Sequence, residues 1–216
     1  MTLHKAIIKL SYSCNNNCFF CHALPKKSVK QLSIDNIKDK INFLSEKEVS
    51  CVLFSGGEPT LRNDLFDILE YAKLKGFSTG LITNSRMLSS SSFVNMLISK
   101  GLKYIYTTLL SSKEKIHNKI TRDNSFDQTI KGIENAVEAG FYVMVNVVLV
   151  RDNLNLIQEI IDLVNAIGVS SIKLSFVEPI SKHDMDYTPD IEIASKKVKE
   201  AIDNNLGVNI GWDGFP

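Results

Sequence analysis

Three of the four cysteines lie within eight residues, in the segment Cys14-Asn-Asn-Asn-Cys18-Phe-Phe-Cys21. Thiolates this close together are typical of metal sites, because both zinc and iron–sulfur clusters take cysteine ligands. A structural zinc ion would need a fourth ligand, either His22 or the distant Cys51. Three thiolates would instead leave one iron of a four-iron cluster free to bind a small molecule. The spacing predicts a metal-binding loop, with zinc and an iron–sulfur cluster both open.

A second motif, Ser55-Gly56-Gly57-Glu58-Pro59-Thr60, follows the apolar run at residues 49–54. Adjacent glycines allow the backbone to approach a ligand closely. A Gly-Gly pair alone is a weak signal, since turns use it constantly. The motif gains weight because the cysteine loop lies one strand–helix unit upstream. Cys51, within the apolar run, reads as a small buried hydrophobic residue rather than a ligand.

Strand-like and helix-like segments alternate along the chain and position these two motifs. Apolar side chains recur at helical spacing in the helices, as in Ile34, Ile37, Ile41 and Leu44. Strands are expected at residues 5–11, 50–55, 78–83, 103–109, 142–150 and 171–177, and a short seventh at 208–212. Helices are expected at residues 33–47, 63–75, 92–100, 125–139, 154–167 and 189–204, with a short helical turn at 113–119. The near-continuous apolar character of residues 142–150 suits a strand buried on both faces.

Six strand–helix units of this kind predict a parallel α/β sheet with right-handed crossovers. They are too few to close an eight-stranded barrel, so we expect an open, partial (β/α)6 TIM-like barrel. A flat doubly wound sheet is the alternative. Either way both motifs lie at the carboxyl ends of neighbouring strands, where such sheets bind ligands. We expect residues 1–216 to form one domain. Residues 192–216 are either a minimal C-terminus or the start of a truncated C-terminal region.

Composition excludes several classes of protein. The chain has 216 residues, of which 44% are hydrophobic and 23% charged, and a formal net charge of +1. These values exclude disordered and collagen-like chains. They also argue against a nucleic-acid binder that works by bulk charge, although a local patch would remain compatible. No apolar stretch is long enough to span a membrane, and the first ten residues do not resemble a secretory signal. A cytoplasmic protein without membrane association is expected.

The cysteine loop and the Gly-Gly-Glu-Pro turn, in this strand–loop–helix setting, resemble the radical S-adenosylmethionine (radical SAM) superfamily. The resemblance covers residues 5–180 and extends more weakly to Thr83-Asn84, Thr107-Thr108, His117, residues 126–140 and Asn146. It implies that Cys14, Cys18 and Cys21 each ligate one iron of a 4Fe–4S cluster, and that S-adenosylmethionine chelates the fourth. It further implies reductive cleavage to a 5′-deoxyadenosyl radical, which abstracts hydrogen from a substrate.

The resemblance also assigns roles around the cofactor. Phe20 matches an aromatic position near the adenine, and the turn Gly56-Gly57-Glu58 matches the site of the methionine ammonium group. Thr108 matches a polar position near the ribose or carboxylate. Asn146 matches a polar position of the fifth strand near the cofactor. Glu178, at the end of the sixth strand, is a candidate for substrate binding or proton management.

The substrate and partners follow less directly. A small molecule, a peptide or a natural-product intermediate is the first expectation, and a nucleoside or RNA base is the second. A reductant such as flavodoxin or ferredoxin would supply the electron. A non-catalytic iron–sulfur or zinc protein is the rival from another functional class.

Several residues depart from the commonest family pattern. The family's Thr-Asn-Gly is Thr83-Asn84-Ser85 here, and an acidic residue common after the fourth strand is replaced by Leu110. His117 lies in a polar helical turn, where a surface or capping role is expected. Ser125 is expected to form a capping box with Gln128.

Overall fold

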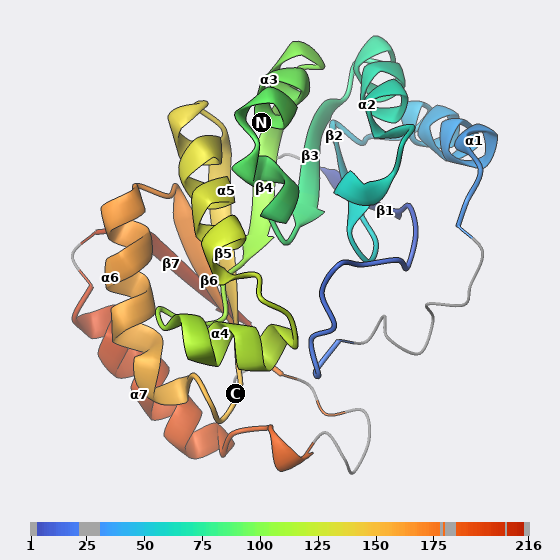
Figure 1. The fold of residues 1–216 in the computed structure, drawn as a ribbon. Coiled ribbons are helices and arrows are strands. Elements are labelled where there is room, and N and C mark those ends of the chain that lie inside the picture. The colour runs from blue at the N-terminus through green and yellow to red at the C-terminus, as the bar shows by residue number, and fades with distance from the viewer. Residues whose placement is uncertain (1–3, 22–30, 178, 180–184, 206, 214–216) are drawn as a thin grey trace.

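A computed structural model describes residues 4–21, 31–177, 179, 185–205 and 207–213 (Figure 1). It contains a seven-stranded sheet in which every neighbouring pair is parallel and the strand order follows the chain. The strands are β1 (Lys5–Lys9), β2 (Cys51–Ser55), β3 (Ser78–Thr83), β4 (Leu102–Thr108), β5 (Tyr142–Leu149), β6 (Ser171–Phe176) and β7 (Asn209–Asp213). A doubly wound sheet reverses its strand order, so this sequential order confirms the partial TIM-like barrel.

Helices flank the curved sheet and connect successive strands (Figure 1). They are α1 (Ile34–Ser45), α2 (Leu65–Leu74), α3 (Ser91–Ser99), α4 (Glu114–Thr121), α5 (Phe126–Glu138), α6 (Ile157–Ile167) and α7 (Ile191–Asp203). Short 3-10 turns add η2 (Pro59–Leu61), η3 (Arg86–Ser89) and η4 (Leu154–Leu156). Ser33 caps α1 as expected, because its hydroxyl accepts the Asn36 N–H at 3.2 Å.

The core lies between one face of the sheet and the helices. Alternate strand residues such as Phe54, Leu81 and Ile105 are fully buried against it. In β1, β4 and β5 the intervening residues line the inner face of the partial barrel and retain exposure; Ile7 is 59% exposed, whereas Cys51 and Leu53 of β2 are buried. β5 follows this alternation, so the prediction that both its faces are buried is wrong. The reason is that side chains do not fill the interior of an open barrel as they fill a closed one.

Two further expectations are settled by the fold. The short seventh strand is real, since β7 pairs in parallel with β6. The capping box is wrong: Ser125 makes no side-chain cap at α5, and its hydroxyl instead donates to Thr121 Oγ1 at 3.0 Å.

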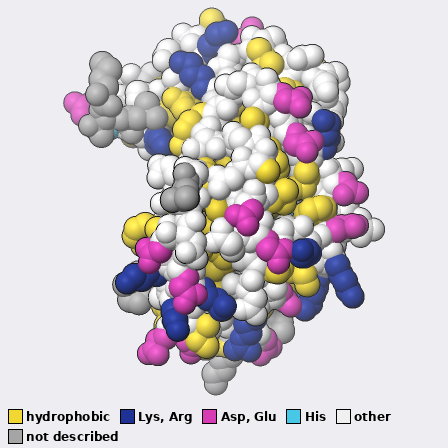
Figure 2. Space-filling model, turned by 90° about the vertical axis from the view of Figure 1, so that its left-hand side faces the viewer, with side chains coloured by type: hydrophobic (Ala, Val, Ile, Leu, Met, Phe, Trp, Pro, Cys, Tyr) yellow, Lys and Arg dark blue, Asp and Glu magenta, His cyan; other side chains and the backbone are white. Residues whose placement is uncertain are grey.

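Charged side chains are spread over the described surface. On the face shown in Figure 2, positive and negative side chains are interspersed rather than gathered by sign. Among the residues described, no helix is both long enough and apolar enough to cross a membrane.

Candidate cofactor site at the carboxyl ends of the strands

The two motifs recognised in the sequence are locked together by their backbones. The N–H groups of Gly57 and Glu58 donate to the carbonyls of Ser11 and Ser13, each at 2.8 Å. A Cβ added to Gly56 would lie 2.4 Å from Ser11 O, and one added to Gly57 would lie 2.2 Å from Ser13 O. Both glycines are therefore required for the turn to lie against the cysteine loop.

A cavity of about 160 Å³ opens between these loops and the ends of β3 and β4. Its lining includes seven of the residues assigned by resemblance: Cys14, Cys18, Phe20, Cys21, Gly56, Gly57 and Thr108. The other lining residues are Asn16, Ser55, Ile82, Thr83, Asn84, Leu110 and Thr121. Three thiols and a glycine turn facing one cavity fit a cluster with a small molecule beside it.

Within the described part of the chain, no group of three His, Cys, Asp or Glu side chains is spaced as ligands of a single metal ion. In a four-iron cluster each thiolate binds a different iron. The three cysteines of the cavity therefore suit a cluster by their chemistry and placement.

Glu58 lies beside the cavity but is not among its lining residues. Its carboxylate is fully buried and accepts hydrogen bonds from Thr60 N, Thr60 Oγ1 and Thr83 Oγ1, at 3.1, 2.6 and 2.7 Å, and from Asn84 N at 2.7 Å. Burial raises the pKa of this carboxyl group, against the four donors that lower it. Glu58 thus ties the glycine turn to the end of β3.

The remaining candidates do not line the cavity or fall outside the described residues. Asn146 is not among the lining residues; its Oδ1 accepts the Ser175 hydroxyl at 2.7 Å. Asn146 pairs in register with Thr108 on the neighbouring strand, so it lies next to the cavity wall. Glu178 and His22 fall outside the residues that the structure describes.

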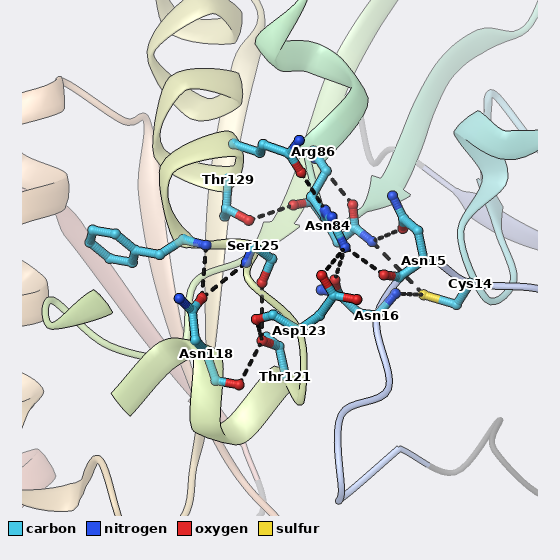
Figure 3. A network of polar contacts seen from close by, with 12 residues as sticks. Cys14, Asn15, Asn16, Asn84, Arg86, Asn118, Thr121, Asp123, Ser125 and Thr129 are labelled. Atoms are coloured by element: carbon cyan, nitrogen blue, oxygen red, sulfur yellow. Dashed lines mark hydrogen bonds and ion pairs between the residues drawn. The ribbon is translucent and has the colours of Figure 1, made fainter. Parts of the chain in front are cut away.

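Arg86 anchors the cysteine loop, a role that the sequence analysis missed. Its guanidinium donates to Asn16 Oδ1 at 2.8 Å and to Asn15 O, and it pairs with Asp123 at 3.1 Å (Figure 3). The end of α4 holds the same loop, because Asn17 N donates to Thr121 O at 2.9 Å. The only signal in the sequence was the position of Arg86 just after the Thr-Asn-Ser segment.

His117 is buried, so the expected surface or capping role is wrong. Its side chain is 1% exposed, and its Nδ1 accepts the Leu110 N–H at 3.3 Å. Burial, helped by the nearby Arg86 charge, lowers the pKa of His117 to about 4. The imidazole is therefore neutral at physiological pH and holds the backbone of a cavity residue.

Asn153 also holds the segment that follows β4, in which Leu110 lies. Its Nδ2 donates to Leu110 O at 2.8 Å and to Val148 O at 2.9 Å, while its Oδ1 accepts the Val150 N–H at 2.8 Å. The side chain is fully buried. The segments that follow β4 and β5 are thereby fixed to each other at the cavity.

Comparison with known proteins agrees with this geometry. Residues 8–164 match the radical SAM superfamily. A probable GTP 3′,8-cyclase of Sulfurisphaera tokodaii is 30% identical over 201 residues, covering 91% of this chain and 64% of the relative. One from Saccharolobus islandicus is 31% identical over 176 residues, covering 80% of this chain and 56% of the relative. The chain thus spans less than two thirds of the length of these relatives.

Solved structures match the fold at lower identity. SuiB of Streptococcus suis bound to the precursor peptide SuiA superposes with a TM-score of 0.83 at 17% identity, covering 98% of this chain and 49% of that one. The structure of anSMEcpe with bound AdoMet gives 0.76 at 17% identity, covering 97% and 64%. The profile match spans most of the strand–helix units and both motifs at the cavity. The chain belongs to the radical SAM superfamily of enzymes.

Proposed function

We propose that Cys14, Cys18 and Cys21 hold a 4Fe–4S cluster at which S-adenosylmethionine is reductively cleaved for hydrogen abstraction from a substrate. The observation that carries this proposal is the single cavity lined by the three thiols and the Gly56-Gly57 turn. When bound, the cluster and S-adenosylmethionine supply the one-electron chemistry, and the protein supplies position and shielding.

The residues of the chain divide this work. The three thiolates bind iron, and the Gly56-Gly57 backbone borders the space where the methionine part would lie. The Thr108 hydroxyl and the Phe20 ring suit a polar contact and an adenine contact. Ile82 and Leu110 give the cavity an apolar lining, which limits the access of water to a reactive group.

For the substrate, we favour a peptide or a peptide-derived intermediate. Tyr104, Tyr106 and Tyr142 lie at inner-face positions of β4 and β5 and retain exposure, so aromatic surface lines the interior of the barrel below the cavity residue Thr108. SuiB and anSMEcpe, each solved with a bound peptide, share the fold.

A purine nucleotide is the second candidate, because the curated relatives are named probable GTP 3′,8-cyclases. Lys173 occupies an inner-face position on β6, in register with Asn146 of β5, and would suit an anionic substrate. In either case the cluster requires a reducing compartment, consistent with a cytoplasmic enzyme served by flavodoxin or ferredoxin.

Anaerobic reconstitution with iron and sulfide, followed by dithionite and S-adenosylmethionine, tests the core proposal. We expect about four irons per chain and formation of 5′-deoxyadenosine, measured by mass spectrometry. The Cys14/Cys18/Cys21→Ala triple variant is the control and should do neither. A wild-type protein that holds the cluster but gives no 5′-deoxyadenosine would contradict the enzymatic assignment.

The same assay separates the substrate classes. GTP should leave the rate of 5′-deoxyadenosine formation unchanged if the substrate is a peptide. A tenfold stimulation by GTP, with deuterium transferred from labelled GTP into 5′-deoxyadenosine, would replace our first choice with the second.

A further inference from the structure

We propose that Asn84 positions the cysteine loop and donates an N–H to the sulfur of Cys14, and that this bond raises the reduction potential of the cluster. The inference rests on the proposed function, since it concerns the cluster that Cys14 would ligate. It assigns Asn84 a positioning and tuning role, not contact with the substrate.

The side-chain amide of Asn84 faces the cysteine loop (Figure 3). Its Nδ2 lies 2.7 Å from Asn15 Oδ1 and 3.8 Å from Cys14 Sγ, so each of its two N–H groups has an acceptor. The backbone N–H of Asn16 donates to the same sulfur at 3.3 Å. Cys14 Sγ therefore receives N–H groups from both a side chain and the backbone.

The orientation of this amide is fixed by its other end. Asn84 Oδ1 accepts the backbone N–H of Arg86 at 3.1 Å. A backbone N–H can only donate, so a flipped amide would set two donors against each other. The NH₂ group must therefore face Cys14 and Asn15.

The backbone of Asn84 is held just as firmly. Its N–H donates to Glu58 Oε2 at 2.7 Å, and its carbonyl accepts the Thr129 hydroxyl at 3.3 Å. Every polar group of Asn84 is thus engaged, by the glycine turn, by α5, by η3 and by the cysteine loop. A donor held in this way is preorganised for the sulfur it faces.

An N–H donor to a ligating sulfur has a defined electrostatic effect. Reduction adds negative charge to an iron–sulfur cluster, and a hydrogen bond to a ligating thiolate stabilises that charge. Removing the donor should therefore make the cluster harder to reduce. The reduction potential measures this effect directly, independently of turnover.

The test compares Asn84→Ala and Asn84→Asp with wild type after reconstitution, by redox titration monitored by electron paramagnetic resonance. Both changes remove the N–H donors, so we expect a more negative midpoint potential in both, with the larger shift in Asn84→Asp because a carboxylate repels the reduced cluster. Gln128→Ala is the matched control. It breaks another bond of the same network, Arg86 Nε to Gln128 Oε1 at 2.7 Å, without touching the sulfur, and should leave the potential unchanged.

The outcomes separate this inference from the proposed function. An unchanged potential in both Asn84 variants, with the cluster intact in wild type, would overturn the tuning role alone. So would loss of the cluster from both variants while Gln128→Ala retains it, since Asn84 would then be merely structural. A wild-type protein that assembles no four-iron cluster would overturn the proposed function together with this inference.

Discussion

The carbonyl oxygen of Ser85 leaves no room for a side chain at Gly132: a Cβ built there would lie only 2.0 Å from it. Helix α5 therefore lies directly against the residue that follows Asn84. Ser85 itself has φ 63°, in the left-handed region that favours glycine. The backbone conformation gives a physical reason for the family's glycine at this position. The same contact brings α5 close enough to help hold residues 84–86, the segment that faces the cysteine loop.

Gly132→Ala should destabilise the protein by about 1–3 kcal/mol, the usual cost of forcing extra atoms into a packed contact. Gly140→Ala is the matched control, because Gly140 has φ 77° and nothing within 4 Å of the position of a Cβ. It should cost only about 1 kcal/mol of backbone strain. Urea unfolding measures both changes, and equal losses would contradict the steric argument.

Ser85→Gly should be more stable than Ser85→Ala by about 1 kcal/mol, because only glycine adopts positive φ without strain. Both variants lose the hydrogen bond from Ser85 Oγ to Thr107 Oγ1 at 2.7 Å, so that loss cancels in the comparison. The difference between their free energies of unfolding is the measurement. Alanine matching glycine would show that the left-handed conformation is not retained.

The partial-barrel fold and the placement of both motifs at the carboxyl ends of neighbouring strands could be predicted from sequence, because both depend on short-range patterns. Apolar periodicity located the strands, and the cysteine and glycine motifs were correctly expected at one end of the sheet. The contacts of Arg86 could not be predicted, because its partners Asn16 and Asp123 are far away in sequence. The burial of His117 was missed for a different reason. The polar residues around it in the sequence lie on the exposed side of α4 and gave no sign of its buried side.

The stability of the protein should depend on pH through His117. Because its folded pKa of about 4 lies below the ordinary value of 6.5, the unfolded chain binds a proton more readily between these values. The free energy of unfolding should therefore fall as pH decreases from 6.5 to 4, by at most about 3 kcal/mol.

Urea unfolding of wild type and His117→Asn across this range measures the His117 contribution. An asparagine Oδ1 can accept the Leu110 N–H in place of Nδ1 but does not titrate. The variant should lose less stability than wild type as the pH is lowered. Parallel pH profiles would show that His117 is accessible to protons in the folded state.

Glu58→Gln should destabilise the protein by about 1–3 kcal/mol near pH 4, because the amide NH₂ must face one of the hydrogen-bond donors whose bonds the carboxyl group now accepts. The raised pKa of Glu58 adds a pH dependence of the opposite sign to that of His117. The stability that Glu58 contributes is fully present below the ordinary carboxyl pKa and is lost as pH rises through the raised one. The difference in free energy of unfolding between wild type and Glu58→Gln should therefore narrow as pH increases. A gap that widens would show that the four donors outweigh burial.

Asn153→Leu should weaken binding of S-adenosylmethionine, because it frees the carbonyl of Leu110, a residue of the cavity wall. It also leaves buried Leu110 O, Val148 O and Val150 N without this partner, which should cost about 1–3 kcal/mol for each group left unsatisfied. Isothermal titration of the reconstituted protein gives the affinity, and urea unfolding gives the stability. Asn165→Leu is the control, since Asn165 also holds backbone, at Val208 N, but is not among the residues that line the cavity. If both variants lost affinity equally, the effect would be global destabilisation and not the fixing of the loop after β4.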